Sequence, residues 1–168
     1  MRLDEAILTA IEYETRIRDH YLDSADRIRN RAGKRVFELL ANEEQGHIDY
    51  LLARLGQWRR EGTVNMFSLS SSVPTPAELE KSLESVEKLE PREVLDDERQ
   101  VLDVALNLEK ETSDYYRRLV GQVDGPAREM FQRFLEIEDG HVAVVQAEID
   151  YLSDNGFWFD FPEFDMEH

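Results

Sequence analysis

The sequence predicts an all-α protein built as a four-helix bundle, with one long crossover between its second and third helices. Four long segments carry apolar residues at spacings of three and four, and strand-like alternation is scarce. Short turns join the first two segments and the last two, whereas residues 61–95 separate the pairs. With 168 residues, 41% of them hydrophobic, the chain suits one domain spanning 1–168.

The first two helices are expected to form an antiparallel hairpin. One is predicted from about Asp4 to Asn30 and the next from about Lys34 to Arg60, with Gly33 as the only break between them. The apolar stripe of the first comprises Ile7, Ala10, Ile11, Ile17, Tyr21, Ala25 and Ile28. The stripe of the second comprises Phe37, Leu40, Leu51, Leu55 and Trp58.

The crossover, residues 61–95, is expected to contain a short helix of its own. Helical periodicity is lost from Glu61 to Ser72, where Gly, Asn and Ser appear. Pro74-Thr75-Pro76 then opens the amphipathic stretch 77–90, and Pro91 closes it.

A second hairpin follows, and an aromatic tail ends the chain. The third long helix is predicted from about Asp96 to Val120, and the fourth from Pro126 to the stop signal Asn155-Gly156. The tail, residues 154–168, contains FWFDFPEF, which is too aromatic to remain in water. We expect it to cover its own bundle, and a dimer interface is the alternative.

Composition excludes several classes of function. The 37 acids and 20 bases give a net charge of −17, which argues against binding to nucleic acid or anionic lipid. The absence of cysteine excludes disulfides, thiolate zinc sites and iron–sulfur clusters. No apolar run is long enough for a membrane span, and the first residues do not resemble a signal peptide. We therefore expect a soluble, cytoplasmic protein.

Two Glu-x-x-His pairs, Glu44/His47 and Glu138/His141, carry the strongest chemical signal. On a helix, residues three apart share a face, so each pair can direct a carboxylate and an imidazole to one point. Single glutamates, Glu14 and Glu109, precede the pairs by about thirty residues and lie within the apolar stripes. The offset between halves is 95 for the single glutamates and 94 for the pairs, which indicates an internal repeat.

Burial of these acids predicts a metal centre. An unpaired buried carboxylate costs several kcal/mol, and two histidines alone do not compensate four of them. Two divalent cations would bring four positive charges. Four carboxylates and two imidazoles suit iron or manganese, with zinc as an adventitious occupant.

Several other polar residues are expected to lie near the centre or at the surface without binding metal. Tyr21 and Tyr116 are expected to be core aromatics whose hydroxyls reach a polar partner, and a ligand carboxylate is the less favoured partner. Glu43 and Glu111 are candidates for groups surrounding the centre. His20 and His168 are expected to be solvated.

With its two single glutamates and two Glu-x-x-His pairs, the chain resembles the rubrerythrin family of the ferritin-like di-iron carboxylate superfamily over about residues 4–153. The resemblance implies a ferritin-like four-helix bundle holding two iron ions. The implied ligands are Glu14, Glu44, His47, Glu109, Glu138 and His141. It further implies that Glu44 and Glu138 bridge the ions, while Glu14, Glu109 and the histidines cap them.

Two departures from the family matter. Classical rubrerythrins carry a rubredoxin domain with four cysteines, which this chain lacks, so an external electron donor protein is expected. A further ligand glutamate, one turn after the first on the third helix, is replaced by Thr112. This substitution puts the ligand exchange of the family in question.

The resemblance implies peroxidase activity, in which hydrogen peroxide, or dioxygen, is reduced at the iron centre. Ferroxidation for iron handling is an alternative enzyme reading. A metal-free helical interaction module, with its core acids protonated or paired, is an alternative of another class. We also expect a homodimer.

Overall fold

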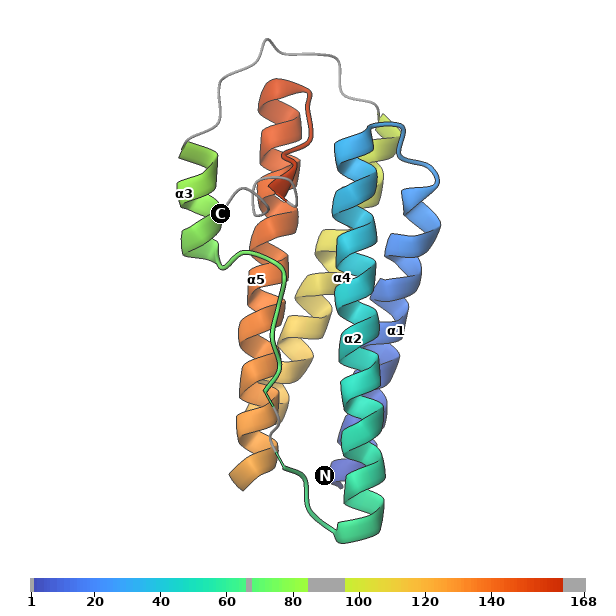
Figure 1. Cartoon of the computed structure of the whole chain (residues 1–168), viewed down its shortest axis with the longest axis vertical. Coiled ribbons are helices and arrows are strands. Elements are labelled where there is room, and N and C mark those ends of the chain that lie inside the picture. The colour runs from blue at the N-terminus through green and yellow to red at the C-terminus, as the bar shows by residue number, and fades with distance from the viewer. Residues whose placement is uncertain (1, 66–67, 85–95, 162–168) are drawn as a thin grey trace.

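The computed structural model describes residues 2–65, 68–84 and 96–161, and these contain helices and no strand. The helices are α1 (Leu3–Ala25), α2 (Arg31–Glu61), α3 (Pro76–Glu84), α4 (Asp96–Val120) and α5 (Gly125–Asn155). The four long helices run side by side, and α3 lies beside α5 on the outside (Figure 1). The predicted all-α four-helix bundle is confirmed.

The bundle consists of two helical hairpins packed together. Helix α1 packs along α2 and α4 along α5, and α1 contacts α4 across the bundle. One apolar cluster, with Ile17, Phe37 and Leu102, lies towards the end near the α1–α2 turn. Another, with Leu51 and Phe131, occupies the opposite end. On every long helix a buried polar segment separates the residues of these two clusters. None of the described helices combines the length and hydropathy that a membrane span requires.

The first turn differs from the prediction. Helix α1 ends at Ala25, and α2 begins at Arg31 because the side chain of Asn30 accepts hydrogen bonds from two backbone N–H groups, those of Ala32 and Gly33. Gly33, predicted as the break, lies inside α2. A Cβ there would come within 2.7 Å of Trp158 Cε2, so the glycine makes room for the tail.

The remaining boundaries follow from recognisable caps. Helix α4 has its predicted bounds, and α5 ends at Asn155, followed by the cap residue Gly156, whose φ of 73° suits glycine. A reciprocal pair of hydrogen bonds between Thr75 and Glu78 opens α3, since each side chain accepts from the other residue's backbone N–H. The predicted continuation of this helix to residue 90 falls in 85–95, outside the described residues.

The described part of the tail covers its own bundle, as predicted. Trp158, Phe159 and Phe161 are buried in the cluster that contains Phe37. The indole N–H of Trp158 donates to Glu98 Oε2 at 3.1 Å, which ties the tail to α4. Residues 162–168 lie outside the described residues.

Candidate metal centre

A polar layer crosses the middle of the bundle, between the two apolar clusters. Each of the four long helices contributes to it, α1 and α4 with one glutamate each and α2 and α5 with a Glu-x-x-His pair. All six predicted site residues are at most 2% exposed. The structure therefore brings together side chains that are up to 127 positions apart in the sequence, as Glu14 and His141 are.

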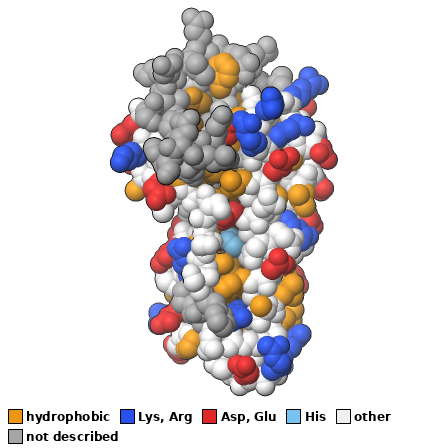
Figure 2. Space-filling model, viewed as in Figure 1, with side chains coloured by type: hydrophobic (Ala, Val, Ile, Leu, Met, Phe, Trp, Pro, Cys, Tyr) orange, Lys and Arg blue, Asp and Glu red, His pale blue; other side chains and the backbone are white. Residues whose placement is uncertain are grey.

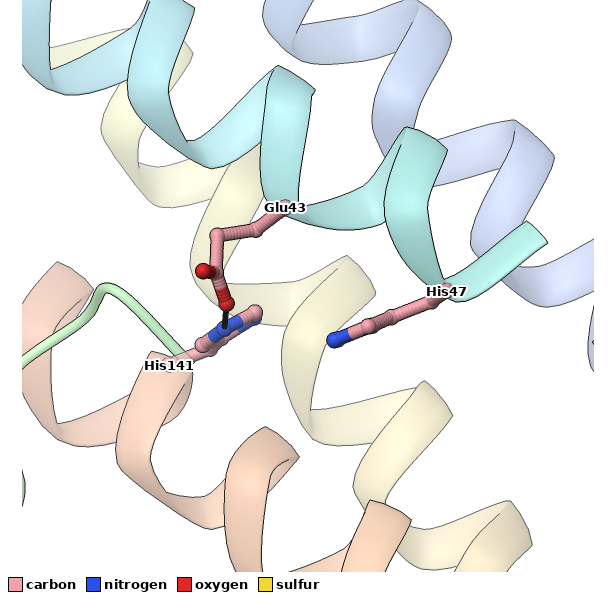
Figure 3. Close-up of side chains that lie close together, drawn as sticks. All are labelled: Glu43, His47 and His141. Atoms are coloured by element: carbon pink, nitrogen blue, oxygen red, sulfur yellow. Dashed lines mark hydrogen bonds and ion pairs between the residues drawn. The ribbon is translucent and has the colours of Figure 1, made fainter. Parts of the chain in front are cut away.

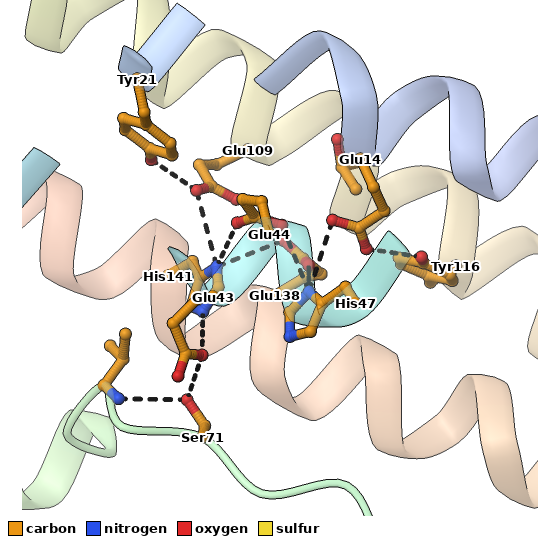
Figure 4. A network of polar contacts seen from close by, with 12 residues as sticks. Glu14, Tyr21, Glu43, Glu44, His47, Ser71, Glu109, Tyr116, Glu138 and His141 are labelled. Carbon is orange, nitrogen blue, oxygen red and sulfur yellow. Dashed lines mark hydrogen bonds and ion pairs between the residues drawn. The ribbon is translucent and has the colours of Figure 1, made fainter. Parts of the chain in front are cut away.

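The six side chains form two overlapping groups (Figure 4). One contains Glu14, Glu44, His47 and Glu138, and the other contains Glu44, Glu109, Glu138 and His141. Within each group the potential ligand atoms lie within 4.8 Å of one another. Glu44 and Glu138 belong to both groups, and that these six residues bind metal stays a prediction.

The shared carboxylates present different oxygens to the two groups. Glu44 Oε2 lies 3.2 Å from His47 Nδ1, while its Oε1 lies 2.8 Å from His141 Nδ1. Glu138 Oε1 lies 3.2 Å from His47 Nδ1, and its Oε2 lies 3.6 Å from His141 Nδ1. Each carboxylate is thus oriented as a bridge between two positions.

Two tyrosines connect the halves of the repeat. The hydroxyl of Tyr21 donates to Glu109 Oε1 at 2.5 Å, and that of Tyr116 donates to Glu14 Oε1 at 2.6 Å. Both hydroxyls therefore bond to predicted ligand carboxylates, which were the less favoured of the partners expected from the sequence. The signal was available in the repeat, because each tyrosine follows a single glutamate by seven residues.

Glu43 is the acid that reaches the edge of the centre. Its Oε2 lies 3.3 Å from His141 Nε2 (Figure 3), and it also accepts hydrogen bonds from Ser71 Oγ at 2.8 Å and Ser72 N at 2.6 Å. Glu111, the other predicted surrounding acid, is 58% exposed and lies 3.8 Å from Arg16.

Two further polar residues lie away from the predicted groups. Thr112 is buried, but its hydroxyl donates to the backbone carbonyl of Leu108 at 2.8 Å, and it joins neither group. His20 is half-buried, with Nε2 2.9 Å from the carbonyl of Val101, so the prediction of a solvated side chain is wrong. It links α1 to α4. His168 lies outside the described residues.

The electrostatics of the layer are dominated by burial. Burial, with the negative charges of Glu14 and Glu109, raises the pKa of Glu44 to about 8, and burial raises the pKa of Glu138 well above its ordinary value. Burial opposes ionisation of Glu14 too, yet His47 and hydrogen bonds bring its pKa down to about 2. By itself, such a cluster retains protons at neutral pH.

The histidines respond to the same carboxylates. Burial lowers the pKa of an imidazole, but the surrounding carboxylates together outweigh this effect, with the charge of Glu14 contributing the largest part of the rise at His47 and the charge of Glu44 the largest part at His141. Both pKa values lie well above the ordinary value.

The donor atoms fit a pair of metal ions. Among the described residues, Glu44 Oε2, Glu109 Oε2 and both oxygens of Glu138 are buried without a hydrogen-bond donor. Leaving buried carboxylate oxygens without donors is costly. Two divalent cations would give these oxygens binding partners and would supply four positive charges. Oxygen and imidazole nitrogen without sulfur suit iron or manganese.

This arrangement, a four-helix bundle with four carboxylates and two imidazoles in its core, defines the class of helical-bundle proteins with carboxylate-bound dinuclear centres. The model of one family, Rubrerythrin, matches residues 5–149, so the chain belongs to the rubrerythrin family, a ferritin-like family of di-iron proteins. Comparison with curated proteins found no match, and comparison with solved structures found none.

Proposed function

We propose that the chain is a non-haem di-iron oxidoreductase that reduces hydrogen peroxide with electrons from an external donor. The main support for a dinuclear metal centre is that two groups of potential ligands share Glu44 and Glu138. Each shared carboxylate offers one oxygen to each group. Family membership supports iron as the metal. The choice of peroxide as oxidant rests on resemblance to the family.

Each side chain has a defined part in holding the ions. Glu44 and Glu138 would bridge them, Glu14 and Glu109 would each bind one ion, and the histidines would bind through Nδ1, the nitrogen facing the carboxylates. A bound pair of ferrous ions would supply the two electrons that cleave the oxygen–oxygen bond. With two protons, hydrogen peroxide becomes two molecules of water.

The surrounding residues orient the ligands and limit access by water. Tyr21 and Tyr116 hold Glu109 and Glu14 by their hydroxyl hydrogen bonds. The ring of Phe134 packs edge-on against His47 with centroids 5.3 Å apart, so an apolar wall lies beside the ligand. Because the chain contains no cysteine to hold a rubredoxin-type iron, the electrons would come from a separate donor.

The test compares two oxidants on the same reduced protein. Protein loaded with iron(II) without oxygen is mixed rapidly with hydrogen peroxide or with dioxygen, and oxidation of the iron is followed by absorbance. We expect peroxide to oxidise the centre faster, with the ferric ions retained by the protein. Oxidation by dioxygen that is equally fast or faster would contradict peroxide reduction, and release of ferric iron would favour ferroxidation.

A Glu44→Ala/Glu138→Ala variant serves as the control for free iron. It removes both shared carboxylates, so any oxidation that it supports comes from iron outside the centre. A parent protein that neither binds iron nor loses stability with chelator would instead favour the metal-free interaction module.

A further inference from the structure

A cavity of about 630 Å³ lies outside the polar layer, between α2 and the crossover segment 68–72. Its lining includes Arg35, Glu43, Gly46, His47, Tyr50 and Ser70. Histidine atoms are visible from outside in the middle of the face drawn in Figure 2. The cavity therefore connects solvent with the edge of a predicted metal ligand.

His47 brings an unpartnered polar atom to this cavity. The side chain is 2% exposed, and its Nε2 has no hydrogen-bond partner among the described residues. Its Nδ1 faces the carboxylates of Glu14, Glu44 and Glu138. If Nδ1 binds metal, the neutral ring carries its hydrogen on Nε2, so a buried N–H donor lies at the cavity.

A third metal ion is a poor match for this place. Glu43, His47 and His141 do approach within 4.8 Å of one another (Figure 3). Yet with both rings bound through Nδ1, both Nε2 atoms carry hydrogens and have no lone pair for a cation. Glu43 already accepts from His141, which leaves His47 as the donor that lacks a partner. The position suits a hydrogen-bond acceptor.

Gly46 keeps the lining open. It precedes His47, and an added Cβ would meet no atom of the other described segments within 4 Å. Gly140 precedes His141 in the other half of the repeat, and an added Cβ there also meets no atom of the other described segments within 4 Å. Gly46 is exposed on the cavity side, whereas Gly140 is buried. The two glycines thus form a matched pair of test positions.

We propose that this cavity is a binding site for a small hydrogen-bond-accepting molecule and the entrance by which such molecules approach the centre, with Nε2–H of His47 as the donor. The inference rests on the metal-binding part of the proposed function. It does not depend on peroxide being the oxidant, since any small acceptor, peroxide included, fits the same description.

The experiment uses azide as the probe and cobalt(II) as a spectroscopic substitute for iron. Azide, a small acceptor, is titrated into the cobalt-loaded full-length protein, and its affinity and association rate are read from visible absorption. Gly46→Leu should fill the lining and weaken azide binding by about tenfold, the order of one lost hydrogen bond, at unchanged cobalt content. Gly46→Ala should reduce affinity less, and Gly140→Ala should leave it unchanged.

Parent-level azide affinity in Gly46→Leu would overturn the inference, as would equal losses in Gly46→Ala and Gly140→Ala. Both alanines are placed where no atom of the described residues obstructs Cβ, and alanine is favoured over glycine in a helix, so both variants should fold. If peroxide proved unreactive while azide binding still depended on position 46, the peroxide assignment would fail and the entrance would stand.

Discussion

The two halves of the centre are alike where they contact the ions and different where they contact their surroundings. Each half supplies a glutamate, a Glu-x-x-His pair and a tyrosine, and each tyrosine bonds to the glutamate of the other half. On the His141 side, Glu43 accepts from Nε2 and is fixed by the crossover. On the His47 side, the position corresponding to Glu43 is Ile137, which offers no acceptor.

A duplicated ligand set therefore need not give two equivalent metal positions. A carboxylate bonded to the far nitrogen of a ligand histidine fixes the ring and makes it a stronger base. His141 has this support, whereas His47 Nε2 has no partner among the described residues. We therefore expect one ion to bind more tightly than the other.

The largest effect is expected from removing the support of His141. Glu43→Ala should weaken the binding of one ion by about 10- to 100-fold, the usual consequence of losing a group that supports a metal ligand. Glu43→Gln keeps an acceptor oxygen and should restore part of the affinity. Titration calorimetry with manganese(II) resolves the two binding steps.

Ile137→Val is the matched control at the corresponding position. It removes one buried methylene group, which costs about 1 kcal/mol of folding stability, and should leave both metal affinities unchanged. Equal weakening of both steps in Glu43→Ala would contradict the inequivalence of the two halves.

The two tyrosines make equivalent hydrogen bonds in the two halves of the centre. Tyr21→Phe and Tyr116→Phe each remove one hydrogen bond to a buried carboxylate, so each should lower the free energy of unfolding of the metal-loaded protein by about 1–3 kcal/mol. Chemical denaturation measures both. A clear inequality between the two would show that the difference between halves extends to the ligands themselves.

A smaller effect is expected outside the centre, where the second half contacts the tail. Glu148 is buried, with Oε2 accepting from Phe159 N at 2.9 Å, while Oε1 has no partner among the described residues. Burial raises the pKa of Glu148 well above 4.5. The folded state therefore keeps a proton that the unfolded state releases, and stability falls as pH rises above about 4.5.

Glu148→Gln should remove this contribution, since glutamine is neutral at every pH. Between pH 5 and pH 8, unfolding free energies of the parent should fall more steeply than those of the variant, by at most about 1.4 kcal/mol per pH unit. Parallel curves would mean that Glu148 titrates normally in the folded protein. Metal is kept saturating in both proteins, so that the centre contributes equally.

Much of the fold was predictable because local signals agreed with the tertiary structure. Helix α4 has the predicted bounds, and Pro126 and Gly156 mark the ends of α5. The first turn was not predictable from glycine alone. Gly33 is required inside α2 because the side chain of Trp158, 125 positions away, packs where a Cβ would lie. The cap at Asn30 was a local signal that the sequence contained and the interpretation did not use.

For the site, helical periodicity was enough to predict that the six principal residues lie together. It does not specify which other side chains form hydrogen bonds to them. The contact between Tyr21 and Glu109 crosses the bundle, and its choice over another polar partner depends on helix packing. The support of His141 by Glu43 depends on the crossover, whose serines carry no periodic signal. Such details arise from tertiary contacts between distant segments.

Whether the centre is dinuclear is tested by the metal content of protein purified without chelators, measured for the parent and for the Glu44→Ala/Glu138→Ala variant. A dinuclear centre predicts about two iron or manganese ions per chain in the parent and their loss in the variant. Less than about half an ion per chain in a folded parent, with no uptake of added iron(II), would contradict the dinuclear centre.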